Sequence, residues 1–95
     1  MADVKEIQAR IGDDGAVFTV KGREAWALDR LLKAGPAGCT PIDQPAPRWS
    51  DYVFKLRRRG LAVETIHEAH GGAYSGHHAR YQLRSPVTVI AEVRA

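Results

Sequence analysis

Apolar and polar residues alternate near the N-terminus and then change to a helical spacing. Ile7 to Ile11 alternates, the turn residues Gly12-Asp13-Asp14-Gly15 follow, and Ala16 to Val20 forms a second short run. Two such runs around a glycine-bounded turn predict a β-hairpin. A short helix is the alternative interpretation, because Val4, Ile7 and Ile11 also have a helical spacing.

The next segment has the pattern of an amphipathic helix from Arg23 to Lys33. Its core stripe consists of the apolar residues that share one face: Ala25, Leu28, Leu31 and Leu32. The segment Gly35-Pro36-Ala37-Gly38 ends this helix. Trp26 lies outside the stripe, so we expect it to point away from the core and to be covered by the terminal segments or by a partner chain.

A second helix is predicted to begin at Pro47 or Arg48 and to run to Arg59. Proline suits a first helical position, and Gly60 suits the position just after the end. The apolar face of this helix consists of Trp49, Tyr52, Val53 and Leu56. The opposite face carries Ser50, Asp51, Phe54, Arg57 and Arg58, with Lys55 at its edge.

Two further extended runs flank the turn from Gly71 to Gly76 and predict a second hairpin. They are Leu61 to His70 and His77 to Arg84. On the returning run, Ala79, Tyr81 and Leu83 lie on one side, and His78, Arg80, Gln82 and Arg84 lie on the other.

The segment from Val87 to Val93 is rich in β-branched residues. It predicts a C-terminal strand, which would pair with the N-terminal hairpin either of the same chain or of a second chain. The whole pattern predicts a single α+β domain over residues 1–95. Its core covers about residues 16–84, and terminal strands lie at residues 4–15 and 87–93.

Composition is that of an ordinary globular protein, with 44% apolar and 26% charged residues. No apolar run approaches the roughly 20 residues that cross a bilayer, and the first residues lack the order of a secretory signal. We therefore expect a soluble cytoplasmic protein.

Cys39 is the only cysteine, so no internal disulfide forms, and we expect a small packed residue there. No nucleophile motif, phosphate loop or acid/base pair points to an enzyme.

Positive charge is concentrated in the second half of the chain, although the net charge is only +3. Residues 48–84 contain seven Arg or Lys residues and three acids, whereas residues 1–32 contain five and six. The excess therefore falls on the second helix and the second hairpin. Such an asymmetry favours a nucleic-acid partner, although a run such as Arg57-Arg58-Arg59 also stabilises a helix C-terminus without any partner.

Four histidines fall in the second hairpin: His67, His70, His77 and His78. No cysteine accompanies them, and the acids Glu64 and Glu68 complete no recognisable ligand motif. We therefore expect no metal and no cofactor. Partial protonation of these histidines below neutral pH instead adds positive charge to the hairpin.

The order of these elements resembles a winged helix. In that family a sequence motif such as Leu56-Arg57-Arg58-Arg59-Gly60-Leu61 ends the recognition helix and leads into the wing. A phrase such as Arg80-Tyr81-Gln82-Leu83 docks the returning wing strand. The resemblance covers about residues 16–84, and the chain is also similar to the small winged-helix proteins of bacteria and their phages. It implies a regulatory DNA-binding protein, with a protein-interaction module as the alternative.

The chain departs from the winged-helix pattern between its two helices. A full helix normally precedes the recognition helix and braces it on the DNA backbone. Here the interval from Thr40 to Pro47 is short and contains Pro41 and Pro45, so at most one helical turn fits. Like Asp51 on the second helix, this departure favours the protein-interaction alternative.

The residues expected to contact double-stranded DNA lie on the second helix and the wing. Arg48 and Ser50 are placed to reach phosphates or base edges. Phe54 is placed to contact a thymine methyl group or to anchor a protein interface. Phe54 covered by the terminal segments is the alternative without a binding role. The full set is Arg48, Ser50, Asp51, Phe54, Lys55, Arg57, Arg58, His78, Arg80 and Arg84. Apolar residues outside the core, including Val87 to Val93, raise the prospect of a homodimer.

Overall fold

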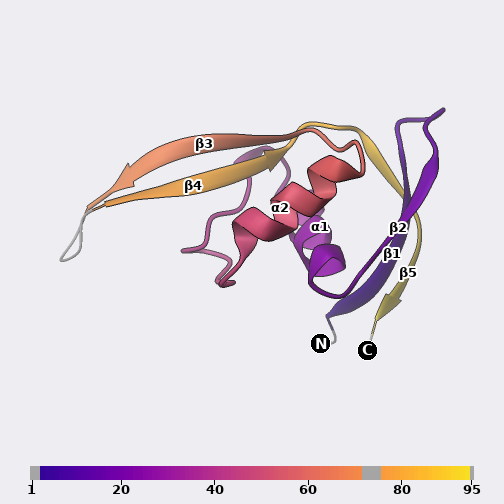
Figure 1. The fold of residues 1–95 in the computed structure, drawn as a ribbon, viewed down its shortest axis with the longest axis horizontal. Coiled ribbons are helices and arrows are strands. Elements are labelled where there is room, and N and C mark those ends of the chain that lie inside the picture. The colour runs from indigo at the N-terminus through magenta and orange to yellow at the C-terminus, as the bar shows by residue number, and fades with distance from the viewer. Residues whose placement is uncertain (1–2, 72–75, 95) are drawn as a thin grey trace.

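Two helices lie between a three-stranded sheet and a long two-stranded hairpin in the computed structural model, which describes residues 3–71 and 76–94 (Figure 1). Both chain ends lie beside the three-stranded sheet. The elements in chain order are β1 (Val4–Ile11), β2 (Val17–Lys21), α1 (Gly22–Ala34), the short 3₁₀ helix η1 (Gly35–Ala37), α2 (Trp49–Arg58), β3 (Val63–His70), β4 (Gly76–Leu83) and β5 (Val87–Arg94).

The three-stranded sheet has the order β2-β1-β5 with antiparallel neighbours. The predicted N-terminal hairpin is therefore confirmed, and the helix through Val4, Ile7 and Ile11 is wrong. The predicted C-terminal strand is also confirmed, since β5 pairs with β1 of the same chain. Buried residues of β1 and β2, including Ile7 and Val20, pack in the core with α1.

Helix α1 is buried over a wider arc than a single apolar stripe. The expectation that Trp26 points away from the core is wrong, because only 8% of its surface is exposed. Its ring lies 5.3 Å from the Trp49 ring and 6.4 Å from the Tyr52 ring of α2. The physical reason is that α1 packs against the sheet on one side and against α2 on the other. Leu32, placed in the stripe by its spacing, is only partly buried.

Helix α2 begins two residues later than Pro47, and its predicted apolar face is confirmed. Trp49, Tyr52, Val53 and Leu56 are all buried. The Trp49 Nε1–H donates to the carbonyl of Gln44 at 2.6 Å, so the polar edge of this buried ring is satisfied. Gly60 follows the helix with a φ of +98°, a conformation that residues with a Cβ rarely adopt.

One helical turn remains where a winged helix has its second helix. The Thr40 hydroxyl accepts from the backbone N–H of Asp43 at 3.1 Å, and the Asp43 carboxylate accepts from the N–H of Thr40 at 2.8 Å. This reciprocal pair is a helix-start motif. The Gln44 N–H then closes a turn on the Thr40 carbonyl at 2.9 Å. No helix continues from it before α2, as the prolines predict.

The β3–β4 hairpin projects beyond the helices, and its base is joined to the segment after η1 (Figure 1). Cys39 and Tyr81 exchange backbone hydrogen bonds of 2.9 and 2.8 Å. Gly38 permits this approach, because a Cβ there would lie 2.5 Å from the Tyr81 carbonyl oxygen. The predicted hairpin is confirmed; Tyr74, which the sequence places in the turn, lies outside the described residues.

Candidate functional site

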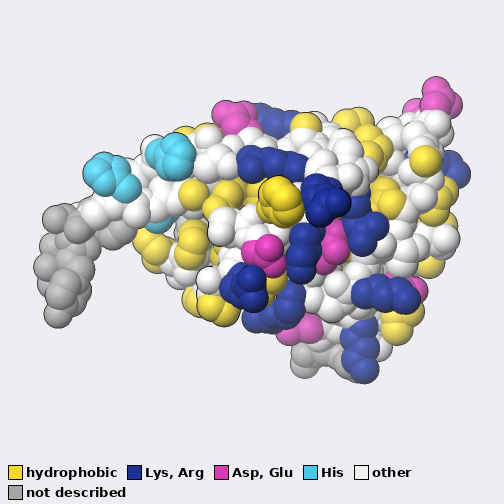
Figure 2. Space-filling view, in the orientation of Figure 1, with side chains coloured by type: hydrophobic (Ala, Val, Ile, Leu, Met, Phe, Trp, Pro, Cys, Tyr) yellow, Lys and Arg dark blue, Asp and Glu magenta, His cyan; other side chains and the backbone are white. Residues whose placement is uncertain are grey.

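The outer face of α2 is open to solvent along the whole helix. Phe54 is 56% exposed, so the terminal segments do not cover it. Ser50, Lys55 and Arg58 are exposed beside it. Figure 2 shows Lys and Arg side chains gathered over α2 and between α2 and the three-stranded sheet, with fewer Asp and Glu side chains among them. This face therefore offers an exposed aromatic ring inside a mainly positive surface.

Asp51 lies between two basic residues of the same helix. Its carboxylate is 3.4 Å from the Lys55 ammonium group and 3.8 Å from the Arg48 guanidinium group. Asp51 and Lys55 are one helical turn apart, a spacing at which opposite charges pair on a helix surface. Because one acid faces two bases, this part of α2 keeps a net positive charge, and Arg48 and Lys55 both stay exposed.

Arg58 is the basic residue most closely tied to the exposed aromatic ring. Its guanidinium carbon lies 5.8 Å from the centre of the Phe54 ring. Within residues 3–71 and 76–94, no ion pair or hydrogen bond occupies its side chain. A guanidinium above a ring is oriented by the cation–π attraction and keeps its N–H donors for another partner.

Arg57 has a different role from its neighbour. Its Nη2 donates to the Val63 carbonyl at 2.6 Å and to the Thr65 hydroxyl at 2.8 Å, and its Nε donates to the Val63 carbonyl at 3.1 Å. These bonds join the end of α2 to the start of β3. The Arg57 side chain therefore fixes the hairpin relative to the helix.

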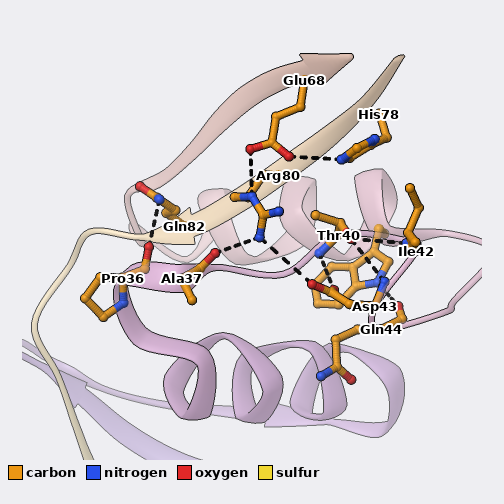
Figure 3. Close-up of polar contacts among 11 residues, drawn as sticks. Pro36, Ala37, Thr40, Ile42, Asp43, Gln44, Glu68, His78, Arg80 and Gln82 are labelled. Carbon is orange, nitrogen blue, oxygen red and sulfur yellow. Dashed lines mark hydrogen bonds and ion pairs between the residues drawn. The ribbon is translucent and has the colours of Figure 1, made fainter. Parts of the chain in front are cut away.

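The side of β4 that was expected to be an open basic surface instead faces the segment between the helices (Figure 3). Arg80 donates to the Glu68 carboxylate and to the Ala37 carbonyl, both at 2.8 Å, and lies 3.9 Å from Asp43. Gln82 donates to the Pro36 carbonyl at 2.8 Å. The Nε and Nη1 donors of Arg80 are therefore used within the molecule.

Glu68 is held between Arg80 and His78, whose Nε2 lies 3.0 Å from the carboxylate. The hydrogen bond from Arg80, followed by that from His78, lowers the pKa of Glu68 below its ordinary value. Arg84 is more exposed and pairs with Glu64 at 2.7 Å. Of the two predicted wing arginines, Arg84 is thus the better placed to meet a partner.

The described part of the hairpin brings its histidines into no metal-binding group. Among the residues that the structure describes, no group of three or more His, Cys, Asp or Glu side chains could hold a metal ion. His67 and His77 are exposed, and the side chain of His70 lies outside what is described.

Sequence reasoning missed the contact between the two helices at Glu24 and Arg59. Arg59 donates through Nε and Nη2 to the two carboxylate oxygens of Glu24. The two residues are 35 positions apart, so no local pattern could reveal the pair. With Lys55 and Arg58 they line a hollow between the start of α1 and the end of α2.

No helix of the described residues is long and apolar enough to cross a membrane. Neither the curated proteins nor the solved structures contain a match to this chain. One family model matches residues 17–93, and it describes a winged helix domain. The match covers α1, α2, the β3–β4 hairpin that forms the wing, and the strands on either side. The chain therefore belongs to the winged helix domain family.

Proposed function

We propose that this protein binds double-stranded DNA through the outer face of α2, and that it acts as a non-enzymatic regulatory protein in the cytoplasm. The observation that carries the proposal is the open face of α2. Its opposite side is buried in the core, while Phe54 and Arg58 stand uncovered within a basic surface. A single helix presented in this way fits the major groove of B-form DNA.

The proposal gives the predicted residues two kinds of role. Ser50 and Phe54 face the base edges, whereas Arg48, Lys55 and Arg58 face the phosphates. Asp51 pairs with Arg48 and Lys55 and holds these two side chains in place.

The wing residues, together with Arg57 of α2, also divide into contact residues and positioning residues. Arg84 is exposed and faces the backbone of the duplex. Arg57 and Arg80 act mainly as positioning residues, because their donors already bind Val63 and Glu68. His78 belongs with Arg80, since it shares the Glu68 carboxylate.

Fluorescence anisotropy with a mixed-sequence duplex over a salt series tests the proposal. Wild-type binding should weaken steeply with salt, because each phosphate contact contributes a slope of about −0.9 to log K against log salt. The double variant Arg48→Ala/Arg58→Ala should bind more weakly, with a shallower slope. The control Lys5→Ala/Arg10→Ala makes the same charge change on β1. Equal binding by both double variants, or no wild-type binding at low salt, would overturn the proposal.

The second candidate function is a protein-interaction module, and the exposure of Phe54 favours it. An exposed aromatic residue is a common anchor of protein interfaces. The discriminating measurement compares Phe54→Ala with Arg58→Ala. A partner that binds at high salt and is lost only with Phe54→Ala supports this candidate, whereas a salt-sensitive loss with Arg58→Ala supports DNA.

A homodimer through β5 accompanies either function. β5 is an edge strand of the sheet, and Val89, Ile90 and Val93 are exposed on it. An edge with exposed apolar residues is a template for pairing with another strand. Light scattering after size exclusion should give a dimer mass for the wild type and a monomer mass for Ile90→Lys. If the wild type still has a monomer mass at about 100 µM protein, the dimer is removed from the proposal.

A further inference from the structure

A hollow lies between the first turn of α1 and the last turns of α2. Four charged side chains line it, three of them basic: Glu24, Lys55, Arg58 and Arg59. Their formal charges leave an excess of two positive charges in the hollow. It borders the outer face of α2, because Arg58 belongs to both and also lies against Phe54.

Glu24 is already committed to Arg59. The Nε and Nη2 groups of Arg59 donate to the two carboxylate oxygens side by side, and only 12% of the Glu24 side chain is exposed. This hydrogen bond is also the main reason why the pKa of Arg59 is raised. The acid is thus used as an internal acceptor, and it holds the guanidinium plane of Arg59 against the wall of the hollow.

The donors that remain in the hollow suit an anion with several oxygens. The Nη1 group of Arg59 binds no acceptor within the described part of the chain, and the same is true of the whole guanidinium of Arg58. Lys55 adds an ammonium group that is 3.4 Å from Asp51 and more than half exposed. Guanidinium and ammonium donors converging on one site bind phosphate oxygens well.

We propose that this hollow is a subsite for one phosphate group of a nucleic-acid backbone, bound by Lys55, Arg58 and Arg59. The inference rests on the proposed function and adds a contact beyond the face of α2. A backbone phosphate in the hollow lies next to the groove that α2 enters, so one duplex occupies both. Glu24 then has two opposite effects on binding. Its carboxylate positions Arg59 for the phosphate, and its negative charge repels the phosphate.

This double role of Glu24 predicts that one substitution improves binding. Glu24→Gln removes the negative charge and keeps an amide oxygen that can still accept from Arg59. Affinity for a duplex at 50 mM salt, roughly one third of physiological ionic strength, should rise about three- to tenfold. Glu92→Gln is the matched control, because it removes the same charge from an ion pair with Arg94 on β5. Its affinity should change less than about twofold.

The closing experiment measures the salt dependence of duplex binding for wild type, Glu24→Gln, Arg59→Gln, Arg59→Lys and Glu92→Gln. Arg59→Gln should make the slope of log K against log salt shallower by about 0.9, the value of one phosphate contact. Arg59→Lys should retain most of the slope, because it keeps the charge. If Arg59→Gln does not fold, as circular dichroism would show, Glu24→Gln and Arg59→Lys carry the test.

The outcomes separate the subsite from the proposed function. If Arg48→Ala weakens binding while the Glu24 and Arg59 variants bind like wild type, the subsite is wrong and the role of α2 stands. If wild type does not bind a duplex, both are wrong. NMR titration with inorganic phosphate separates a second source of the ligand. Saturation by millimolar phosphate, combined with unchanged duplex slopes, means a site for free phosphate and overturns the nucleic-acid assignment.

Discussion

The three-stranded sheet and the β3–β4 hairpin are attached to the helices by different forces. The sheet contributes fully buried side chains to the core, among them Ile7 and Val20. Among its described residues, the hairpin contributes two buried side chains near its base, Val63 and Tyr81. It is also held by charged hydrogen bonds, from Arg57 of α2 to the Val63 carbonyl and from Arg80 of β4 to the Ala37 carbonyl. Apolar burial therefore fixes the sheet, and directed polar contacts fix the position of the hairpin.

This difference changes how the positive charge of the chain is interpreted. A count along the sequence treats every arginine between residues 48 and 84 as available to a partner. The structure shows that Arg57 and Arg80 donate hydrogen bonds that attach the hairpin to α2 and to the segment after α1. Within that range, most of the exposed basic side chains lie on α2 or at its two ends, and Arg58, against the Phe54 ring, is the clearest of them. Arg84 beside the wing is exposed as well.

The largest expected effect is in the sheet. Ile7 is fully buried, so Ile7→Ala removes apolar contacts and leaves a cavity. The free energy of unfolding should fall by about 2–5 kcal/mol, measured by urea unfolding with circular dichroism. The control Val17→Ala, at an exposed position on the opposite edge strand β2, should cost less than about 0.5 kcal/mol. A similar loss for both variants would contradict the view that burial holds the sheet.

Arg57→Ala tests the hairpin and should have a smaller, local effect. Loss of its bonds to Val63 and Thr65 should lower stability by about 1 kcal/mol, because the side chain is partly screened by solvent. Hydrogen exchange should speed up in β3 before it does in β1. Arg58→Ala removes the same charge from the next residue and should leave the exchange of β3 unchanged. Equal effects of the two variants would assign the loss to charge alone.

Acid should loosen the hairpin before it affects the sheet. The pKa of Glu68 is held below its ordinary value of 4.5, first by Arg80 and then by His78. The ionised carboxylate therefore stabilises the folded state above pH 4.5, and this contribution disappears as the pH falls through the lower folded-state pKa. Exchange of β4 amides should accelerate in that window. Asp43 also faces Arg80, so Glu68→Gln isolates the part that belongs to Glu68. An acid response of the same size in this variant contradicts the assignment.

The smallest effect concerns Cys39, whose thiol reports on the attachment of the hairpin. Burial, followed by the charge of Asp43, raises its pKa to about 11. At pH 8 the thiol stays protonated, so alkylation by iodoacetamide should be much slower than for a free thiol. Arg80→Ala should increase the rate several-fold, because Cys39 pairs with β4. Ile90→Ala serves as the control. Fast alkylation of the wild type would show that the hairpin base opens readily.

Local patterns were enough to predict the elements, because each has its own periodicity. Alternation marked the N-terminal hairpin, and the spacing of Trp49, Tyr52, Val53 and Leu56 marked the buried face of α2. Prolines correctly predicted the loss of the second helix, since their effect is local too.

Contacts between elements were beyond the same patterns. Trp26 was misplaced because its environment depends on α2, which lies far along the chain. Arg80 was expected on an open surface because alternation gives the two sides of a strand but not what faces each side. The pair between Glu24 and Arg59 left no signal at all, since it depends on how the two helices pack.

The two sides of the junction between the hairpin and the segment after α1 contribute different kinds of hydrogen-bonding group. Arg80 and Gln82 contribute side chains, whereas Ala37 and Pro36 contribute only main-chain carbonyls. A carbonyl is retained whatever side chain is present. Across related chains the two residues of β4 should therefore vary little, while positions 36 and 37 are free to drift. Sequence divergence can thus remodel the segment between the helices without detaching the wing.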